Sequence, residues 1–237
     1  MAKKSRTPAP PRVVQAPKRR DTRKAPQQAA GRRNRMILYA VAAAGIVALA
    51  VVIAVVARGG GGSSSKPAPP VDWSALPGLQ KGPAPWGPGF DGLPDRLGPL
   101  GLPALSAEAL AFHIHQHLDI FINGKQIHVP GLIGINDNQF ITVLHTHDQS
   151  GILHVESPTN RQFSLAEFFG VWGVKLTRNC IGRYCATPST PLRAYVNGKR
   201  HYGDPGRIVL KSHEEIALVY GKAGGPIPKS YKFPAGD

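Results

Sequence analysis

Residues 112–122, FHIHQHLDIFI, alternate between two kinds of side chain, and this period of two constrains the fold more than any other stretch. Successive side chains of a β-strand point to opposite faces, so the three histidines and Asp119 are expected on one face and the aliphatic residues on the other. Asn123-Gly124 is the strongest short signal for a tight hairpin, with KQIHVP as the returning strand. The segment therefore predicts a β-domain with histidines on one face.

A second hairpin is predicted where ITVLHTHD and ILHVES flank the turn QSG. Ser164 with Glu167 three residues later forms a capping box, and apolar residues at helical spacing follow it, which predicts a helix that ends near Gly173. Further strands are predicted in PLRAYVNGKR and RIVLKSHEEIALVYG. The expected fold is α+β: a mostly antiparallel β-domain over residues 105–221 with one packed helix, followed by an extended tail over 222–237.

The N-terminal part of the chain predicts a membrane anchor. Residues 36–57 are 22 consecutive residues without a charge, and about 20 apolar residues cross a bilayer as a helix. Residues 1–35 carry twelve Lys or Arg and one acid, which predicts a disordered basic tail. The positive-inside rule places this tail in the cytoplasm and the chain after Arg58 outside, as a single-pass protein of the cell membrane. A signal peptide cleaved after Ala57 is the competing interpretation.

This topology also defines the expected partners. The cations of the tail are expected to contact anionic lipid headgroups of the lipid bilayer. A basic arm can also bind nucleic acid, but the adjoining apolar span explains the charge more simply, so no specific nucleic acid is expected.

Residues 58–104 are rich in Gly, Ser and Pro and begin RGGGGSSSKPAPP, which predicts a flexible linker followed by a stiffer stalk. Trp73, Trp86 and Phe90 lie in this stretch. Because aromatic side chains are rare in true linkers, parts of the stalk are expected to lie against the domain.

Seven of the nine histidines fall between residues 113 and 154, which is typical of a metal site. If the turn pairs His147 with Ile152, then His145 lies opposite His154, and opposed Cβ atoms are about 4.5–5.5 Å apart. Neutral imidazole suits Zn or Cu, so a transition metal is the expected cofactor. The candidate ligands are His145, His147, His154, His113, His115 and His117. The candidate partners that would orient these ligands are His128, Asp119 and Glu156.

Two other interpretations of the histidines stay open. Clustered imidazoles repel one another when they are protonated near pH 6, so the group would also suit a pH-responsive switch. A hydrogen-bonded array without any ligand is the second alternative.

Cys180 and Cys185 are the only two cysteines and lie beyond the predicted membrane span. Oxidising conditions outside the cytoplasm favour a disulfide between them, which would close a short loop. A redox-active pair is a weaker interpretation, because the motif C-x-x-C is missing.

Two resemblances accompany this pattern. Two strands, a capped helix and then YVNGK…GDPGRIVLKSHEEIALV resemble the β-grasp fold of sulfur-carrier and ubiquitin-like proteins over residues 141–221. The carboxyl-terminal Gly-Gly end of that family is missing, because Gly224-Gly225 is followed by Pro226, so only the fold is implied. The string HIHQHLDIFINGK…LHTHDQSGILHVES…FSLAEFF is similar to a group of bacterial membrane-anchored extracytoplasmic proteins without an established activity, which implies no functional residues.

Three classes of function follow. The first is a membrane-anchored extracytoplasmic protein that binds Zn or Cu through strand histidines. The second is a metal-dependent hydrolase or hydratase, in which three histidines leave an open position for water and Glu156 is the candidate general base. The third is a metal-free protein-interaction module. The sequence contains no H-E-x-x-H, nucleophile elbow or phosphate loop, which leaves it uncertain whether the protein is an enzyme.

Overall fold

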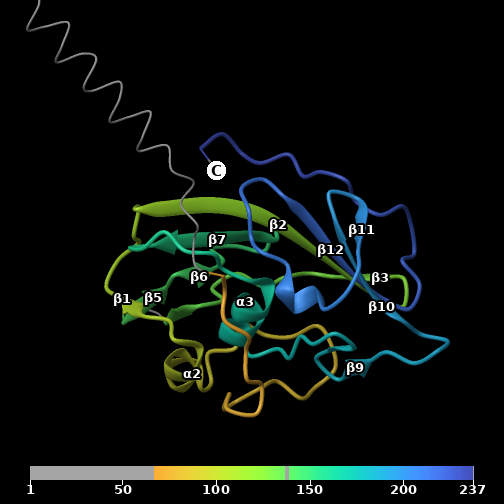
Figure 1. The fold of residues 1–237 in the computed structure, drawn as a ribbon, viewed down its shortest axis with the longest axis horizontal. Coiled ribbons are helices and arrows are strands. Elements are labelled where there is room, and N and C mark those ends of the chain that lie inside the picture. The colour runs from red at the N-terminus through yellow and green to blue at the C-terminus, as the bar shows by residue number, and fades with distance from the viewer. Residues whose placement is uncertain (1–66, 137–138, 237) are drawn as a thin grey trace, which may run out of the picture. The chain divides into compact units, whose positions relative to one another are not determined.

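The computed structural model describes residues 67–136 and 139–236 and is built around one seven-stranded sheet (Figure 1). In chain order the elements are α2 (Leu93–Leu100), β1 (Ala104–Leu105), β2 (Phe112–Ile122), β3 (Lys125–Ile127), β4 (Ile135–Asn136), β5 (Phe140–Thr142), β6 (Leu144–His145), β7 (Ile152–Ser157), α3 (Leu165–Trp172), β8 (Cys180–Ile181), β9 (Tyr184–Cys185), β10 (Leu192–Val196), β11 (Lys199–His201), the 3-10 turn η1 (Pro205–Arg207) and β12 (Glu215–Tyr220).

The main sheet has the strand order β11-β10-β12-β2-β7-β6, and β3 pairs with β2 beside this path. Strands β1, β5 and β4 form a small second sheet, and β8 with β9 forms a hairpin. The expected β-rich fold is confirmed, but the main sheet is mixed, because β12 runs parallel to β2. An alternating pattern predicts that a segment is a strand without specifying its neighbour or its direction, which is why the parallel pair was missed.

Strand β2 shows the alternation that its sequence predicts. Leu118, Ile120 and Ile122 are buried in the hydrophobic core, on the side of the sheet that carries α3 (Figure 1). The Asn123-Gly124 turn has positive φ angles at both residues, as a two-residue hairpin requires, and β3 returns along β2. The histidines of β2 therefore lie on the opposite side of the sheet, where the C-terminal segment passes.

Helix α3 begins and ends where the local sequence predicts. The Ser164 hydroxyl accepts a hydrogen bond from the Glu167 backbone N–H, and the Glu167 carboxylate accepts one from the Ser164 backbone N–H. Gly173 ends the helix with a φ of 74°, a left-handed conformation that glycine adopts without strain. Every residue of α3 is buried, so the helix forms the centre of the core.

A second helix, α2, lies in the segment that was expected to be a stalk, so the domain contains two short helices where one was expected. Arg96 of α2 is fully buried and donates hydrogen bonds to the carbonyl oxygens of Gly170 and Val171 in the last turn of α3. Carbonyls in the last turn of a helix lack the usual intrahelical partner, and the guanidinium caps α3 together with the Gly173 N–H, which also donates to the Gly170 carbonyl. Two prolines and a glycine in LPDRLGPL hide the helix from a pattern search.

The aromatic residue Trp86 joins this segment to the core. Its side chain is only 4% exposed, and its ring lies edge-on to Trp172 with the centroids 5.7 Å apart. Trp172 Nε1 donates a hydrogen bond of 2.7 Å to the Gly87 carbonyl. Much of the expected stalk is therefore part of the packed domain. Removing its apolar side chains from water is favourable, and a free linker would leave them exposed.

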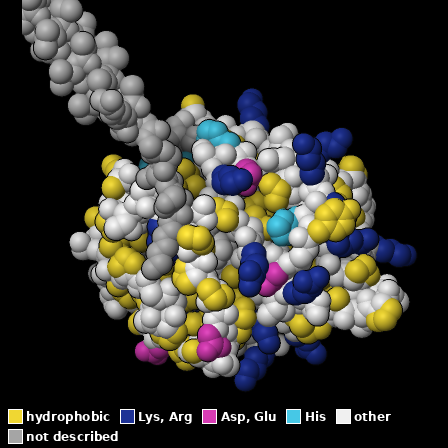
Figure 2. All heavy atoms as spheres, viewed as in Figure 1, with side chains coloured by type: hydrophobic (Ala, Val, Ile, Leu, Met, Phe, Trp, Pro, Cys, Tyr) yellow, Lys and Arg dark blue, Asp and Glu magenta, His cyan; other side chains and the backbone are white. Residues whose placement is uncertain are grey.

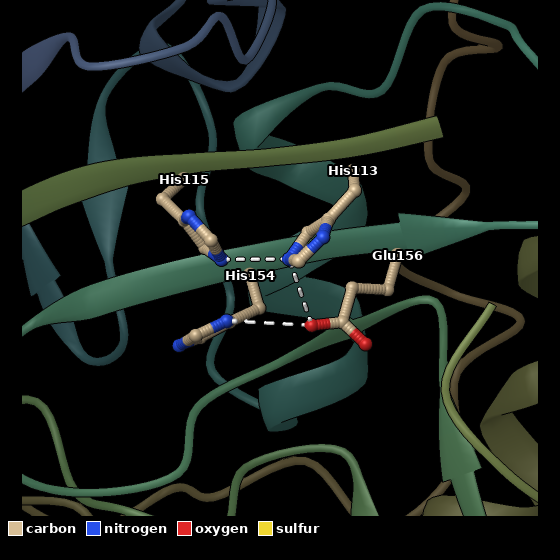
Figure 3. A group of neighbouring side chains, drawn as sticks. All are labelled: His113, His115, His154 and Glu156. Atoms are coloured by element: carbon tan, nitrogen blue, oxygen red, sulfur yellow. Dashed lines mark hydrogen bonds and ion pairs between the residues drawn. The ribbon is translucent and has the colours of Figure 1, made fainter. Parts of the chain in front are cut away.

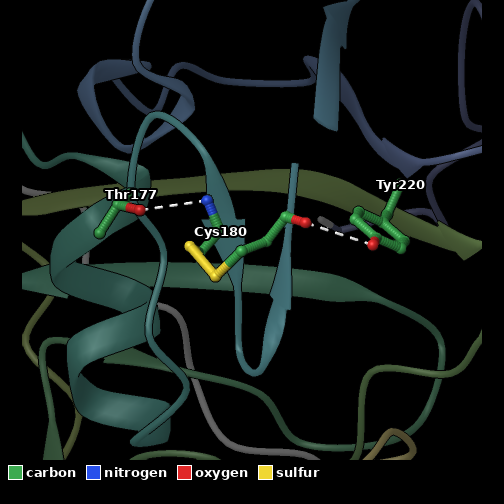
Figure 4. Close-up of a disulfide and its surroundings, with 4 residues drawn as sticks. Thr177, Cys180 and Tyr220 are labelled. Carbon is green, nitrogen blue, oxygen red and sulfur yellow. Dashed lines mark hydrogen bonds between the residues drawn. A yellow bond between two sulfur atoms is a disulfide. The ribbon is translucent and has the colours of Figure 1, made fainter. Parts of the chain in front are cut away.

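The disulfide predicted between Cys180 and Cys185 is present and joins β8 to β9 (Figure 4). The Cys180 backbone N–H donates to Thr177 Oγ1 at 3.1 Å, and the Tyr220 hydroxyl donates to the Cys185 carbonyl at 3.2 Å. The second contact attaches the cross-linked loop to the last strand of the main sheet.

The predicted basic tail at 1–35 and the predicted membrane span at 36–57 lie outside the described residues. Among residues 67–136 and 139–236, no helix combines the length and the apolar character needed to cross a bilayer.

Candidate metal centre

Three neighbouring strands bring histidines to the same level of the sheet. His145 of β6 lies opposite His154 of β7, and His154 also lies opposite His115 of β2. The predicted pairing of His145 with His154 is thus confirmed, and the order β2-β7-β6 extends it to a row across three strands. In the same register Glu156 lies opposite His113. The centre therefore forms because β7 pairs with a histidine-bearing strand on each side.

The first cluster combines His113 and His115, called here the β2 pair, with His154 and Glu156 (Figure 3). The two Nε2 atoms of the β2 pair are 2.9 Å apart, and Glu156 Oε1 is 3.2 Å from His113 Nε2. Glu156 Oε1 is also 3.6 Å from His154 Nδ1. All four side chains point toward one another, and one ligand atom from each lies within 4.8 Å of the others.

The second cluster combines His145 and His147, called here the β6 pair, with the same two residues, His154 and Glu156. The Nε2 atoms of the β6 pair are 3.3 Å apart, and Glu156 Oε1 is 3.8 Å from His145 Nε2. His145 Nδ1 lies 2.9 Å from the Thr142 carbonyl oxygen. Because a carbonyl only accepts, Nδ1 carries the proton and Nε2 keeps its lone pair, which faces His147 Nε2 and could instead bind an ion.

Burial keeps the inner imidazoles neutral. Desolvation, with the neighbouring histidines adding to it, lowers the pKa of both His145 and His154 to about 3. Desolvation also raises the pKa of the Glu156 carboxyl, and the charge of Glu108 raises it further. At neutral pH these two histidines are unprotonated, which is the form that could bind a metal ion. In the folded protein their protonation lies well below pH 6.

His117 lies apart from both clusters, although the sequence grouped it with the other histidines. It belongs to a third cluster with Asp119 and Glu215, in which His117 Nδ1 is 2.7 Å from Glu215 Oε2. His117 Nε2 is 2.9 Å from the Ser150 carbonyl, and the Tyr231 ring stacks on the imidazole at 3.8 Å. Both ring nitrogens therefore already have protein partners.

The His117–Glu215 pair holds a proton. Burial lowers the pKa of His117, but the hydrogen bond and the charge of Glu215 outweigh it, so the pKa is raised. The pKa of Glu215 is also raised, chiefly by burial. An ion on either ring nitrogen would have to displace the Glu215 carboxylate contact or the Ser150 carbonyl contact. We therefore regard the pair as a structural contact between β2 and β12. The imidazole also holds Tyr231 of the C-terminal segment, whose residues 222–236 contain no helix or strand.

The three expected orienting residues have different positions. Glu156 supplies an oxygen to both histidine clusters, so it has the position of a ligand. Asp119 accepts a hydrogen bond of 2.7 Å from Gln126 Nε2 and belongs to the third cluster. His128 is exposed just beyond β3 and belongs to none of the three clusters found among the described residues. Glu156 Oε1 faces three histidine nitrogens, and the general-base role of Glu156 stays a prediction.

Sequence reasoning missed Glu108 and Glu215. Glu108 is half exposed and lies 3.5 Å from His147 Nε2, at the outer edge of the β6 pair. Glu215 faces His117 only because β12 runs parallel to β2 in the register Glu215–His117. Glu215 directly precedes the apolar run IALVY, which was a visible signal. Its partner His117 lies 98 residues earlier in the chain, so the contact could not be predicted from the local pattern.

His115, His145 and His154 are buried. Histidine side chains make up a small part of the face shown in Figure 2. Comparison with known protein families, curated proteins and solved structures found no match. The functional argument therefore depends on the geometry of the clusters, which could hold a metal ion.

Proposed function

We propose that this chain is a single-pass, membrane-anchored extracytoplasmic protein that binds zinc or copper through the histidines of β2, β6 and β7. The observation that carries the proposal is the convergence of five histidines and Glu156 from three adjacent strands and from the turn after β6, which carries His147. A chance surface array would not bury three imidazoles and a carboxylate together, because polar groups without partners are costly inside a protein.

The chemistry of the donor set supports a borderline transition metal. Neutral imidazole nitrogen is a good ligand for Zn and Cu, and a carboxylate oxygen completes many such sites. The hydrogen bond from His145 Nδ1 to the Thr142 carbonyl is the usual way in which a metal-ligating imidazole is oriented. The two cysteines are joined in a disulfide, so neither offers a thiolate to the ion.

The location outside the cytoplasm is supported by charge and by the disulfide. Twelve cations precede the uncharged run at 36–57, which favours an N-terminus on the cytoplasmic side. A disulfide closing a short loop persists under the oxidising conditions beyond the membrane.

Elemental analysis of the full-length protein, purified in mild detergent without a polyhistidine tag or chelator, tests the proposal. The matched variant carries His115→Ala, His145→Ala and His154→Ala, which removes one ligand from each strand. We expect stoichiometric zinc or copper in the wild type and none in the variant, with circular dichroism showing that the variant keeps its β-structure.

A wild-type protein without metal, even after reconstitution with zinc and with copper, would contradict the proposal. That result would favour the metal-free interaction module. The same metal content in wild type and variant would place the ion elsewhere in the chain and would equally reject this centre.

A further inference from the structure

The two histidine clusters share the same two residues. His154 and Glu156 both lie on β7, which is the strand between β2 and β6. The β2 pair completes one cluster and the β6 pair completes the other. The shared residues therefore lie between the β2 pair on one side of β7 and the β6 pair on its other side.

The β6 pair has the spacing of two ligands on one tetrahedral ion, and the β2 pair lies a few tenths of an ångström closer than that spacing. Ligands about 2.0–2.1 Å from a tetrahedral zinc ion lie about 3.3–3.4 Å from each other. The two Nε2 atoms are 3.3 Å apart in the β6 pair and 2.9 Å apart in the β2 pair. A single four-coordinate ion would be bound by one pair together with His154 and Glu156. The other pair would then have no metal ion to bind.

The shared residues also have unused ligand atoms. Within the described part of the chain, His154 Nδ1 and Glu156 Oε2 are buried and have no hydrogen-bond partner. Leaving such an atom unpaired costs on the order of 1–3 kcal/mol. Glu156 Oε1 faces the histidines, at 3.2 Å from His113 Nε2 and 3.8 Å from His145 Nε2. The same oxygen therefore faces both pairs, and Oε2 is a further ligand atom of this carboxylate without a hydrogen-bond partner.

We propose that the centre binds two transition-metal ions bridged by the carboxylate of Glu156, one on the β2 pair and one on the β6 pair. His154 completes one of the two sites, because a neutral imidazole has a single unprotonated nitrogen. This inference rests on the proposed function, since it adds a second ion to the same centre.

Solvent access at both ends makes this charge tolerable. Two divalent ions and one carboxylate leave excess positive charge, which is costly in a dry interior. The outer histidine of each pair reaches water, because the side chains of His113 and His147 are 35% and 44% exposed. Water or hydroxide can complete the coordination there, and Glu108 lies 3.5 Å from His147 Nε2 to offset part of the charge.

Native mass spectrometry of the full-length protein during titration with zinc chloride counts the ions. We expect two zinc ions per wild-type chain. His113→Ala and His147→Ala each remove a partly exposed ligand from one pair, so each variant is expected to bind one zinc ion and to fold normally. His201→Ala changes a histidine outside all three clusters and is expected to keep two ions.

Electron paramagnetic resonance of the copper(II)-loaded protein gives a second readout that depends on no variant. Two copper(II) ions bridged by one carboxylate couple magnetically, so the wild type is expected to show a coupled spectrum with a half-field transition. The two single-pair variants are expected to show the spectrum of an isolated copper(II) ion that integrates to one per chain.

The outcomes separate the two proposals. One zinc ion per wild-type chain, with an uncoupled copper spectrum, would overturn the two-ion inference and leave the proposed function standing. No ion in the wild type would overturn both. Two ions in the wild type and in both variants would show that neither pair is a site, which also rejects the inference.

Discussion

At the scale of the residue, the orientation of each imidazole depends on the atom that its other nitrogen contacts. The Thr142 carbonyl fixes the proton of His145 on Nδ1, so that Nε2 faces the cluster. His117 differs because both of its nitrogens are held, by Glu215 and by the Ser150 carbonyl. Two histidines with the same alternation in sequence thus have different chemical roles.

The first prediction concerns the inner ligands. His145→Ala and His154→Ala are each expected to weaken zinc affinity at least about tenfold, because each removes a buried nitrogen that faces the centre. Competition with a chromophoric chelator measures the change. His201→Ala is the control and should leave the affinity unchanged; equal losses in all three variants would reject the assignment.

At the scale of the element, the turn between β6 and β7 sets the register of the centre. Gly151 in this turn has a φ of +87°, and a Cβ there would lie 2.8 Å from His117 Nε2. Gly98 in α2 is the opposite case, because a Cβ at this exposed helical position would meet nothing within 4 Å. The two glycines differ both in backbone conformation and in surroundings, so they serve as contrasting substitution sites.

The second prediction uses this pair. Gly151→Ala is expected to lower the free energy of unfolding by about 1–3 kcal/mol, because it strains the backbone and displaces His117. Gly98→Ala is expected to change it by less than about 1 kcal/mol, because the better helix propensity of alanine is opposed by contact of its Cβ with the ring of Pro99. Urea unfolding of both variants beside the wild type compares the two changes. Equal losses in the two variants would contradict the assigned role of the turn at Gly151.

At the scale of the whole molecule, the stability of the metal-free protein depends on pH through the buried histidines. The pKa of His145 and His154 is about 3 in the folded protein and 6.5 in the unfolded reference. As the pH falls below 6.5, the unfolded chain takes up these protons first, so stability falls between pH 6.5 and pH 3. The raised pKa of Glu156 acts in the opposite direction and offsets part of this loss.

The third prediction follows from this linkage. Between pH 7 and pH 5 each of the two histidines is expected to cost the metal-free protein about 2 kcal/mol of unfolding free energy. Urea unfolding at several pH values measures the slope. A variant with His145→Gln and His154→Gln should show a flatter profile, and an unchanged profile would mean that other groups cause the dependence.

Zinc is expected to stabilise the folded protein. At a free zinc concentration about 100-fold above Kd, the free energy of unfolding should rise by about 2.7 kcal/mol.

The fourth prediction concerns topology. A protease added outside intact cells is expected to remove the domain and to spare the basic tail at 1–35, because the positive-inside rule keeps the tail in the cytoplasm. Antibodies against each end, used on immunoblots of the treated cells, report the outcome. Digestion of the tail with survival of the domain would reverse the proposed orientation.

The sequence alone was sufficient for features that depend on residues close together in the chain. The alternation of β2, the register of His145 with His154, the capping box at Ser164 and the Cys180–Cys185 disulfide were all predicted and are present. Each depends on a period of two or on a turn, cap or loop of a few residues.

Only the tertiary structure decided which of these local features meet. It placed β7 between β2 and β6, so the β2 pair joins the same centre, and it laid β12 parallel to β2, which brings Glu215 to His117. It also brought Arg96 from the expected stalk onto the end of α3. Strand order and such contacts depend on which apolar surfaces are buried together across distant parts of the chain, and no local pattern contains that information.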